Sequence, residues 1–263
     1  MSSPTWPDDD ASPSGPVVLV VQHEPGAPAA LVGDWLVERG LQLRVVHAYA
    51  GDPVPSAVPG DVDGVLVLGG GMGAWDDDVA PWLPATRALL AACARDDVPT
   101  WGVCLGGQLL AAATGGQVAL GDLAELGVCD VTVTDADDPL MATLGPAGTT
   151  VGVTQFHRDG ITALPPGAVP LATSTGYPHQ AFRLGRRVWG VQFHPEVDAA
   201  VVAPWLAEEP DVAASAGRTP AQVVAEIDAA APVLVATWRP FAHAFADVVL
   251  AGAGATAPGP AGP

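Results

Sequence analysis

The chain has 263 residues, of which 49% are hydrophobic and 15% are charged, a composition typical of a globular protein with a buried core. Its formal net charge is −19, and all ten basic residues are Arg, so the sequence contains no Lys. The missing Lys excludes Schiff-base chemistry and a phosphate-binding loop ending in Gly-Lys-Ser/Thr. The negative charge and the scattered Arg residues argue against binding to nucleic acid or to a membrane surface.

Three cysteines are an odd number and form no Cys-x-x-Cys pair, which argues against a disulfide framework and a cysteine zinc site. No two His residues stand at a ligand spacing, so we expect neither a metal site nor a cofactor. The first ten residues contain no basic residue and precede no apolar segment, unlike a secretory signal. No stretch looks long and apolar enough to span a bilayer. These features predict a cytoplasmic protein.

Both ends of the chain are expected to be disordered tails. Residues 1–16 are rich in Pro, Ser and Asp, and residues 251–263 consist of Ala, Gly and Pro apart from one Thr. A single domain is expected between them, over residues 17–250.

Short apolar runs alternate with helical patterns in the first half of the chain. This alternation predicts an α/β fold with a mostly parallel sheet flanked by helices, in which ligands bind at the carboxyl ends of the strands. The expected strands are 17–21, 41–46, 64–68 and 100–103, and the expected helices are 29–39, 84–95 and 105–113.

The second half is expected to be richer in strands and more antiparallel, with helix at its end. Thr219, Pro220 and Gln222 provide an N-cap, a first-turn proline and a capping-box partner for a C-terminal helix. We expect Pro232 to divide this segment into two helices. The expected strands are 128–134, 149–156, 169–174, 179–184 and 188–193, separated by Gly, Pro and Asp.

A candidate nucleophile stands where the strand 100–103 meets the helix 105–113. Residues 102–106 read Gly-Val-Cys-Leu-Gly, the Gly-x-nucleophile-x-Gly pattern of a tight strand-to-helix turn. Cys104 would lie at the top of the sheet, where the helix N-terminus favours a thiolate. The backbone N–H of Leu105 would point into the same space and serve an oxyanion hole. The alternative is that Cys104 is a buried structural thiol, the role that Cys93 and Cys129 fit better.

A base and an acid for this thiol are found in Gly-Val-Gln-Phe-His-Pro-Glu, residues 190–196. Pro195 favours an extended backbone at His194, and side chains two residues apart in an extended strand project to the same side. Glu196 could therefore accept a proton from one ring nitrogen of His194 and leave the other nitrogen facing a thiol. The alternative is a His at a strand end and a solvated Glu.

Glycines follow the strand 64–68, in the run Gly-Gly-Gly-Met-Gly at residues 69–73. Their backbone N–H groups are unobstructed and suit a second oxyanion donor or an anion site. A nucleotide phosphate loop is a weaker alternative, because the Gly-x-Gly-x-x-Gly spacing is not met and acidic residues follow. His157, which lies two residues before Asp159, is interpreted as part of a pocket or a loop.

Together these motifs resemble the class I (triad) glutamine amidotransferases, and most closely the stand-alone members similar to the amidotransferase domain of GMP synthase. The resemblance rests on the order and separation of residues 68–70, 102–108 and 191–196 and spans about residues 17–249. It implies a flavodoxin-like fold of this family. The sequence departs from the family pattern at Gly107, where a larger residue is common, and at Gly71, where Pro is common.

The resemblance implies that Cys104 is the nucleophile, His194 the base and Glu196 the orienting acid. It further implies that the N–H groups of Gly70 and Leu105 form the oxyanion hole. The expected substrate-binding residues are Gln108, Gly71 and His157.

The implied reaction is hydrolysis of the glutamine side-chain amide through a γ-glutamyl thioester, with the ammonia supplied to an acceptor on an unidentified partner. The acceptor enzyme is either a separate synthetase subunit or absent. Two alternatives remain: a γ-glutamyl hydrolase or peptidase acting on a γ-glutamyl amine or peptide, and a non-catalytic regulatory or binding module. A homodimer is left open as well. Trp205 and Trp238 are expected to be packing residues.

Overall fold

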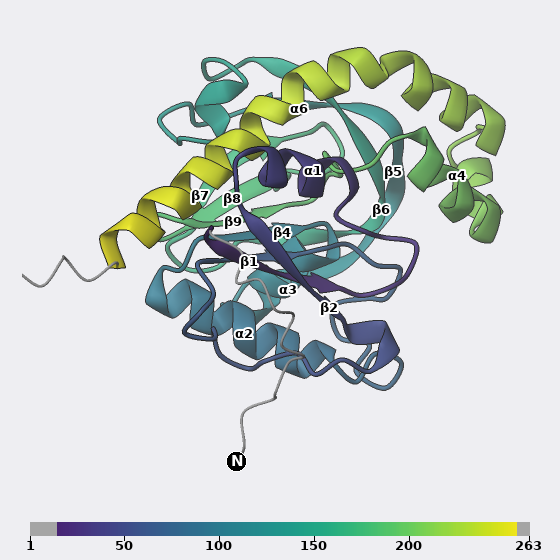
Figure 1. Cartoon of the computed structure of the whole chain (residues 1–263). Helices are drawn as coiled ribbons and strands as arrows, with labels where there is room; N and C mark the ends of the chain where they lie inside the picture. Colours follow the sequence, from purple (N-terminus) through teal and green to yellow (C-terminus); the bar gives the residue numbers. More distant parts are fainter. Residues whose placement is uncertain (1–14, 257–263) are drawn as a thin grey trace, which may run out of the picture.

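The structure, a computed structural model, describes residues 15–256 (Figure 1). The expected tail segments 1–14 and 257–263 lie outside the described residues. Within residues 15–256, one nine-stranded sheet runs through the molecule in the order β2-β1-β3-β4-β9-β8-β7-β5-β6. Its strands are β1 (Val17–Gln22), β2 (Gln42–His47), β3 (Gly64–Val67), β4 (Thr100–Val103), β5 (Gln117–Val133), β6 (Thr150–Ala163), β7 (Val169–Thr173), β8 (Ala181–Leu184) and β9 (Val188–Val191).

Helices cover both faces of this sheet, as Figure 1 shows. One core lies between the sheet and α1 and α6, and a second core lies between the sheet and α2 and α3. The helices are α1 (Ala30–Glu38), α2 (Leu83–Asp96), α3 (Leu105–Ala113), α4 (Ala199–Glu208), α5 (Pro210–Ser215) and α6 (Pro220–Thr256), with short 3-10 turns at Ala48–Ala50 and Met141–Thr143.

The strands β2, β1, β3, β4 and β9 are parallel, and the pairs from β9 through β8, β7 and β5 to β6 are antiparallel. The expected α/β class, with a parallel half and a more antiparallel second half, is therefore confirmed. Every residue of β3, β4 and β9 is buried, because helices cover both faces of these strands. Their carboxyl ends meet at one edge of the sheet, which is where the candidate nucleophile stands.

The strand β5 starts at Gln117, well before the expected residue 128. The start of β5 contains residues that favour turns, namely Gly121, Asp122 and Gly127. It nevertheless pairs with the long strand β6. The register shifts between Leu120 and Glu125, so the ladder absorbs these residues in an irregularity rather than ending.

The helix α6 is continuous over 37 residues, although Pro232 and Pro240 lie inside it. The expectation that Pro232 divides this segment into two helices is therefore wrong. A proline inside a helix removes one backbone hydrogen bond, and its ring crowds the preceding turn, which together cost about 3 kcal/mol. The buried side chains of Trp238, Phe241 and others offset this cost by packing on the sheet. The helix also extends to Thr256, so residues 251–256, expected as part of a tail, are helical.

By length and apolar composition, α6 does meet the criterion for a membrane-crossing helix, contrary to the sequence expectation. This finding is weak evidence, because a core helix passes the same test. Phe241, Phe245 and Val249 on its inner face are fully buried against the sheet.

The helix α4 was not expected from the sequence. Its start has a clear signal, since the Asp198 carboxylate caps the helix by accepting from the backbone N–H of Val201 at 3.0 Å. Pro204 lies inside it and masks the helical pattern. This helix carries Trp205 and Glu208 to the candidate active site.

Candidate active site

Cys104 forms the expected elbow between β4 and α3. Its backbone lies at φ 49° and ψ −108°, a strained conformation for a residue with a side chain. Glycine is required on both sides of it. A Cβ atom on Gly102 would lie 2.5 Å from the carbonyl oxygen of Gly106, and one on Gly106 would lie 2.1 Å from that of Val67. The close approach of β3, β4 and α3 thus forces the sulfur to the end of the sheet.

His194 and Glu196 lie beside this elbow, just beyond the end of β9. The backbone N–H of His194 donates to the carbonyl of Thr154 at 2.9 Å. The His194 ring Nδ1 is 2.7 Å from Oε1 of Glu196, and both side chains are buried. The ring edge of Trp205 packs on the imidazole with 5.2 Å between ring centroids. The acid therefore binds one ring nitrogen of a histidine that packing holds in place.

The charge on His194 is stabilised by its neighbours. Burial disfavours the charged ring, but the charges of Glu196 and Cys104 and the hydrogen bonds to both side chains outweigh burial and raise the pKa of His194 well above its usual value. An imidazolium facing the sulfur can stabilise a thiolate and later donate its proton to a leaving group.

The loop after β3 reaches the same place. A Cβ atom on Gly69 would lie 2.9 Å from Cε1 of His194, and one on Gly70 would lie 3.2 Å from Cδ2 of Leu105. Leu105 is the first residue of α3, so its N–H has no acceptor within the helix. Among the described residues, the N–H groups of Gly70 and Leu105 donate no hydrogen bond. The two expected oxyanion donors are thus brought together and available.

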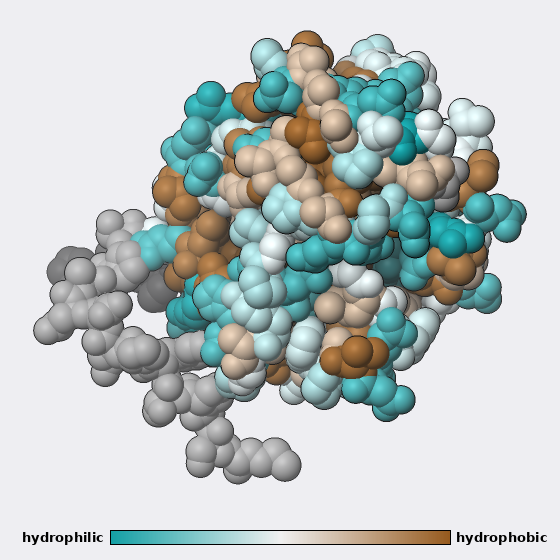
Figure 2. All heavy atoms as spheres, turned by 90° about the vertical axis from the view of Figure 1, so that its right-hand side faces the viewer, coloured by the Kyte–Doolittle hydropathy of each residue, from teal (hydrophilic) through white to brown (hydrophobic). Residues whose placement is uncertain are grey.

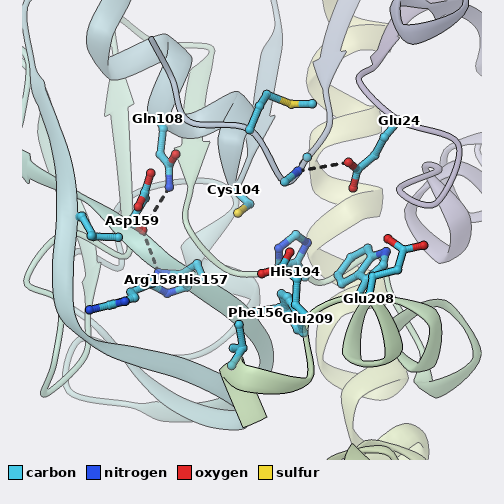
Figure 3. Close-up of a pocket in the computed structure, with 16 residues that line it drawn as sticks. Glu24, Cys104, Gln108, Phe156, His157, Arg158, Asp159, His194, Glu208 and Glu209 are labelled. Carbon is cyan, nitrogen blue, oxygen red and sulfur yellow. Dashed lines mark hydrogen bonds between the residues drawn. The ribbon is translucent and has the colours of Figure 1, made fainter. Parts of the chain in front are cut away.

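A cavity of about 340 Å³ opens over the sulfur of Cys104. Figure 3 shows Cys104, His194 and Glu209 near its middle, with Gln108, His157 and Asp159 to one side and Glu24 and Glu208 to the other. Of the expected site residues, six line this cavity: Gly70, Gly71, Cys104, Gln108, His157 and His194.

All three expected substrate contacts are already hydrogen bonded to the protein. The Gln108 Nε2 atom donates to the carbonyl of Asp159 and to Oε1 of Gln192, both at 3.1 Å. The His157 Nδ1 lies 2.9 Å from the Asp159 carbonyl, and its Nε2 lies 3.0 Å from Glu125. The N–H of Gly71 donates to Glu24 at 3.2 Å. His157 therefore borders the cavity without a free ring nitrogen.

Acidic residues that the sequence analysis did not identify line the outer side of the cavity. Glu24, Glu208 and Glu209 form no ion pair within residues 15–256. Burial, together with repulsion from the other two carboxylates, raises the pKa of Glu209. Glu208 and Glu209 come from the end of α4, so overlooking that helix also concealed these residues.

Gln192 is a further residue that the sequence analysis did not identify. Its Nε2 atom lies 3.5 Å from Sγ of Cys104. Gln192 lies two residues before His194 at the end of the same strand, and alternate residues of a strand project to one side. This spacing is the sequence signal that places Gln192 on the same side as His194. In the described part of the chain, no group of three or more His, Cys, Asp or Glu side chains is placed to hold a metal ion.

Known proteins with similar sequences include glutamine-hydrolyzing GMP synthases. The chain is 33% identical over 168 residues to the enzyme of Phenylobacterium zucineum, an alignment covering 64% of this chain and 30% of that protein. It is 39% identical over 140 residues to one subunit of the enzyme of Natronomonas pharaonis, covering 52% of this chain and 67% of that polypeptide. The chain thus matches only 20% to 30% of the length of the first full-length relatives.

Solved structures show the same fold. A glutamine amidotransferase of Thermotoga maritima superimposes with a TM-score of 0.77 at 24% identity, covering 88% of this chain and 98% of that chain. A glutamine amido transferase of Methylobacillus flagellatus gives 0.74 at 29% identity, covering 90% and 94%.

A family model described as Glutamine amidotransferase class-I matches residues 31–204, from α1 through α4 and including the elbow and the His-Pro-Glu segment. The match covers more than half of the chain. The chain therefore belongs to the class I glutamine amidotransferase family.

Proposed function

We propose that the chain hydrolyses the side-chain amide of glutamine with Cys104 as nucleophile, His194 as acid and base, and Glu196 as the orienting acid. The observation that carries the proposal is the buried His194–Glu196 pair, 2.7 Å apart, beside a cysteine on a strained strand-to-helix elbow. A nucleophile, a base and a group that orients the base are the parts that covalent amide hydrolysis requires.

The proposed reaction has two halves. The Cys104 thiolate attacks the amide carbon, and the N–H groups of Gly70 and Leu105 stabilise the oxyanion. His194 then donates its proton to the nitrogen, ammonia leaves, and a γ-glutamyl thioester remains. Water attacks the thioester while His194 accepts its proton, which releases glutamate and restores the thiolate. Each oxyanion donor contributes a rate factor of about 10² to 10³.

Labelling and turnover together test this proposal. A diazo-ketone analogue of glutamine should add its mass, less dinitrogen, to the peptide containing Cys104, and the protein should release ammonia from glutamine. We expect Cys104→Ser to abolish both while the fold is retained. Cys129→Ser is the matched control, because burial raises the pKa of that thiol to about 11 and it does not line the cavity. Normal turnover by Cys104→Ser would contradict the assignment.

An ammonia acceptor on a separate synthetase chain is part of the proposal. Support comes from the relative in Natronomonas pharaonis, which is named as one subunit of a GMP synthase. A cytoplasmic location is also proposed, since the cysteines Cys93, Cys104 and Cys129 are all free and the nucleophile must stay reduced. Co-purification of the chain with a synthetase that raises its ammonia release would support the first point.

A γ-glutamyl amine is a second candidate substrate, and the acidic side of the cavity favours it. Glu24 and Glu208 lie on the side of His194 away from Gln108 (Figure 3), and Glu209 lines the same cavity. We expect the leaving amine to be placed near these carboxylates. A leaving group with a second, cationic amine would offset their repulsion. Faster hydrolysis of a γ-glutamyl diamine than of glutamine would favour this candidate, with the advantage reduced at high salt. Absence of labelling and of turnover on both substrates would instead favour a non-catalytic module.

A further inference from the structure

Gln192 is a buried amide in contact with the sulfur of Cys104. It follows β9, and none of its surface is exposed. Its Nε2 lies 3.5 Å from Sγ of Cys104, and its Oε1 lies 3.1 Å from Nε2 of Gln108. Its backbone N–H donates to the carbonyl of Gln180 at 2.8 Å, which holds the residue in place at the strand end.

The neighbours of Gln192 determine which end of its amide faces the sulfur. A backbone carbonyl can only accept hydrogen bonds, so the atom of Gln108 that lies 3.1 Å from the Asp159 carbonyl must be its NH₂ group. That same NH₂ group contacts Gln192, which must therefore present its oxygen to Gln108. The NH₂ group of Gln192 is left to face Cys104, as a donor.

A hydrogen-bonded pair, His157 and Glu125, anchors the other end of this chain of hydrogen bonds. The ring of His157 has the Asp159 carbonyl at one nitrogen and the Glu125 carboxylate at the other, and both groups accept when Glu125 is ionised. Burial opposes the charge on Glu125, but hydrogen bonds from His157 and Ser174 hold its pKa below the usual value. The ring is therefore held between these two oxygens, which fixes its contact with the Asp159 carbonyl.

We infer that Gln192 is a positioning residue for the nucleophile, whose amide N–H holds the Cys104 sulfur as a thiolate in front of His194. A hydrogen bond to a charged acceptor is stronger than one to a neutral acceptor, so a fixed donor at the sulfur favours the thiolate over the thiol. Gln108 acts through Gln192, and the His157–Glu125 pair acts through the Asp159 carbonyl. The inference rests on the proposed role of Cys104.

Alkylation of Cys104 by iodoacetamide as a function of pH tests the inference in the full chain. The rate follows the thiolate, and mass spectrometry of the Cys104 peptide separates it from the other thiols. In Gln192→Met we expect the midpoint of the rate profile to rise by about one pH unit, a tenfold slower reaction near neutral pH, because a hydrogen bond to a charged group is lost. Gln192→Glu should raise the midpoint further, because a carboxylate repels the thiolate.

Steady-state kinetics adds a second readout. Gln192 itself does not line the cavity, so its substitution should lower kcat by about tenfold and change KM for glutamine less, through Gln108 alone. Gln155→Met is the matched control. Gln155 is also fully buried and donates to Gln180 at 2.8 Å, but it has no contact with the sulfur. It should keep the wild-type alkylation profile.

Circular dichroism identifies the variants that fold. If Gln192→Met and Gln192→Glu unfold, Gln192→Asn provides the same readout, because it keeps the amide but is too short to reach the sulfur. A wild-type midpoint in the folded Gln192 variants, or an equal shift in Gln155→Met, would overturn the inference. Alkylation requires no glutamine, so this result is independent of glutamine hydrolysis: a protein without turnover can still show the Gln192 effect.

Discussion

The proton on His194 is stabilised by the Glu196 carboxylate together with Cys104. The pKa of His194 is raised despite its burial, so the imidazolium persists to higher pH than in an isolated histidine. In the proposed reaction this proton goes to the leaving ammonia, and activity should fall as pH rises through the raised pKa. Glu196 thus sets the alkaline limit of activity as well as the orientation of the ring.

We therefore expect Glu196→Gln to move the alkaline limb of the kcat/KM profile to lower pH, because a neutral amide no longer stabilises the imidazolium. We also expect kcat to fall by about 10²-fold, near the low end of what a positioned proton transfer contributes. The pH dependence of ammonia release from glutamine measures both effects. Glu226→Gln is the control, since Glu226 pairs with Arg218 on the surface. An unchanged alkaline limb in Glu196→Gln would refute the role of Glu196.

The proposed triad could be located from the sequence because its signals are local. Cys104 lies between two required glycines, and His194 and Glu196 are two residues apart at a strand end. Gln192 and the glutamates of the cavity wall have no such local signal of function. Their roles depend on the distance from β9 to the elbow and on the place of α4, which only the tertiary structure determines.

Among the elements, α3 matches its expected residues, since the glycine-flanked elbow defines its start. The elements that differ from their expected bounds are those in which tertiary contacts override a residue that locally disfavours a helix or a strand. β5 continues through glycines because β6 pairs with it, and α6 continues through Pro232 because aromatic side chains pack beneath it. Local propensity could not show either compensation.

The helix α6 also supports the histidine end of the active site. Trp238 is buried, packs on Phe193 with 4.8 Å between ring centroids, and donates from Nε1 to the carbonyl of Gly152 at 3.0 Å. Phe193 directly precedes His194 in the chain. We expect Trp238→Ala to lower the free energy of unfolding by about 3–5 kcal/mol through the cavity it leaves.

Urea denaturation at neutral pH measures this loss. Val233→Ala is the control on the same helix, because Val233 is 68% exposed and should change stability by less than about 0.5 kcal/mol. At urea concentrations where Trp238→Ala remains folded, its kcat should also fall, since Phe193 loses the support that places His194. Equal stability of the two variants would mean that α6 contributes little to the core.

On the scale of the whole molecule, the charge is unbalanced. The chain has 29 acidic and 10 basic residues, and nine of the ten Arg residues already form ion pairs within residues 15–256. Figure 2 shows the side of α4 and the β5–β6 pair, where hydrophobic residues occur in small groups among hydrophilic ones. The unpaired carboxylates repel one another, and a synthetase that docks on this protein should present a basic or neutral face.

Added salt should stabilise the isolated protein, because it screens this repulsion. We expect the melting temperature at pH 7 to rise between about 20 mM and 300 mM NaCl, and about 1 kcal/mol of relieved repulsion corresponds to roughly 2–4 °C for a chain of this size. The rise should largely disappear near the isoelectric point of about 4.2, where net repulsion vanishes. Choline chloride in place of NaCl distinguishes screening from specific binding of sodium. An equal rise at both pH values would show that the surplus of carboxylates does not limit stability.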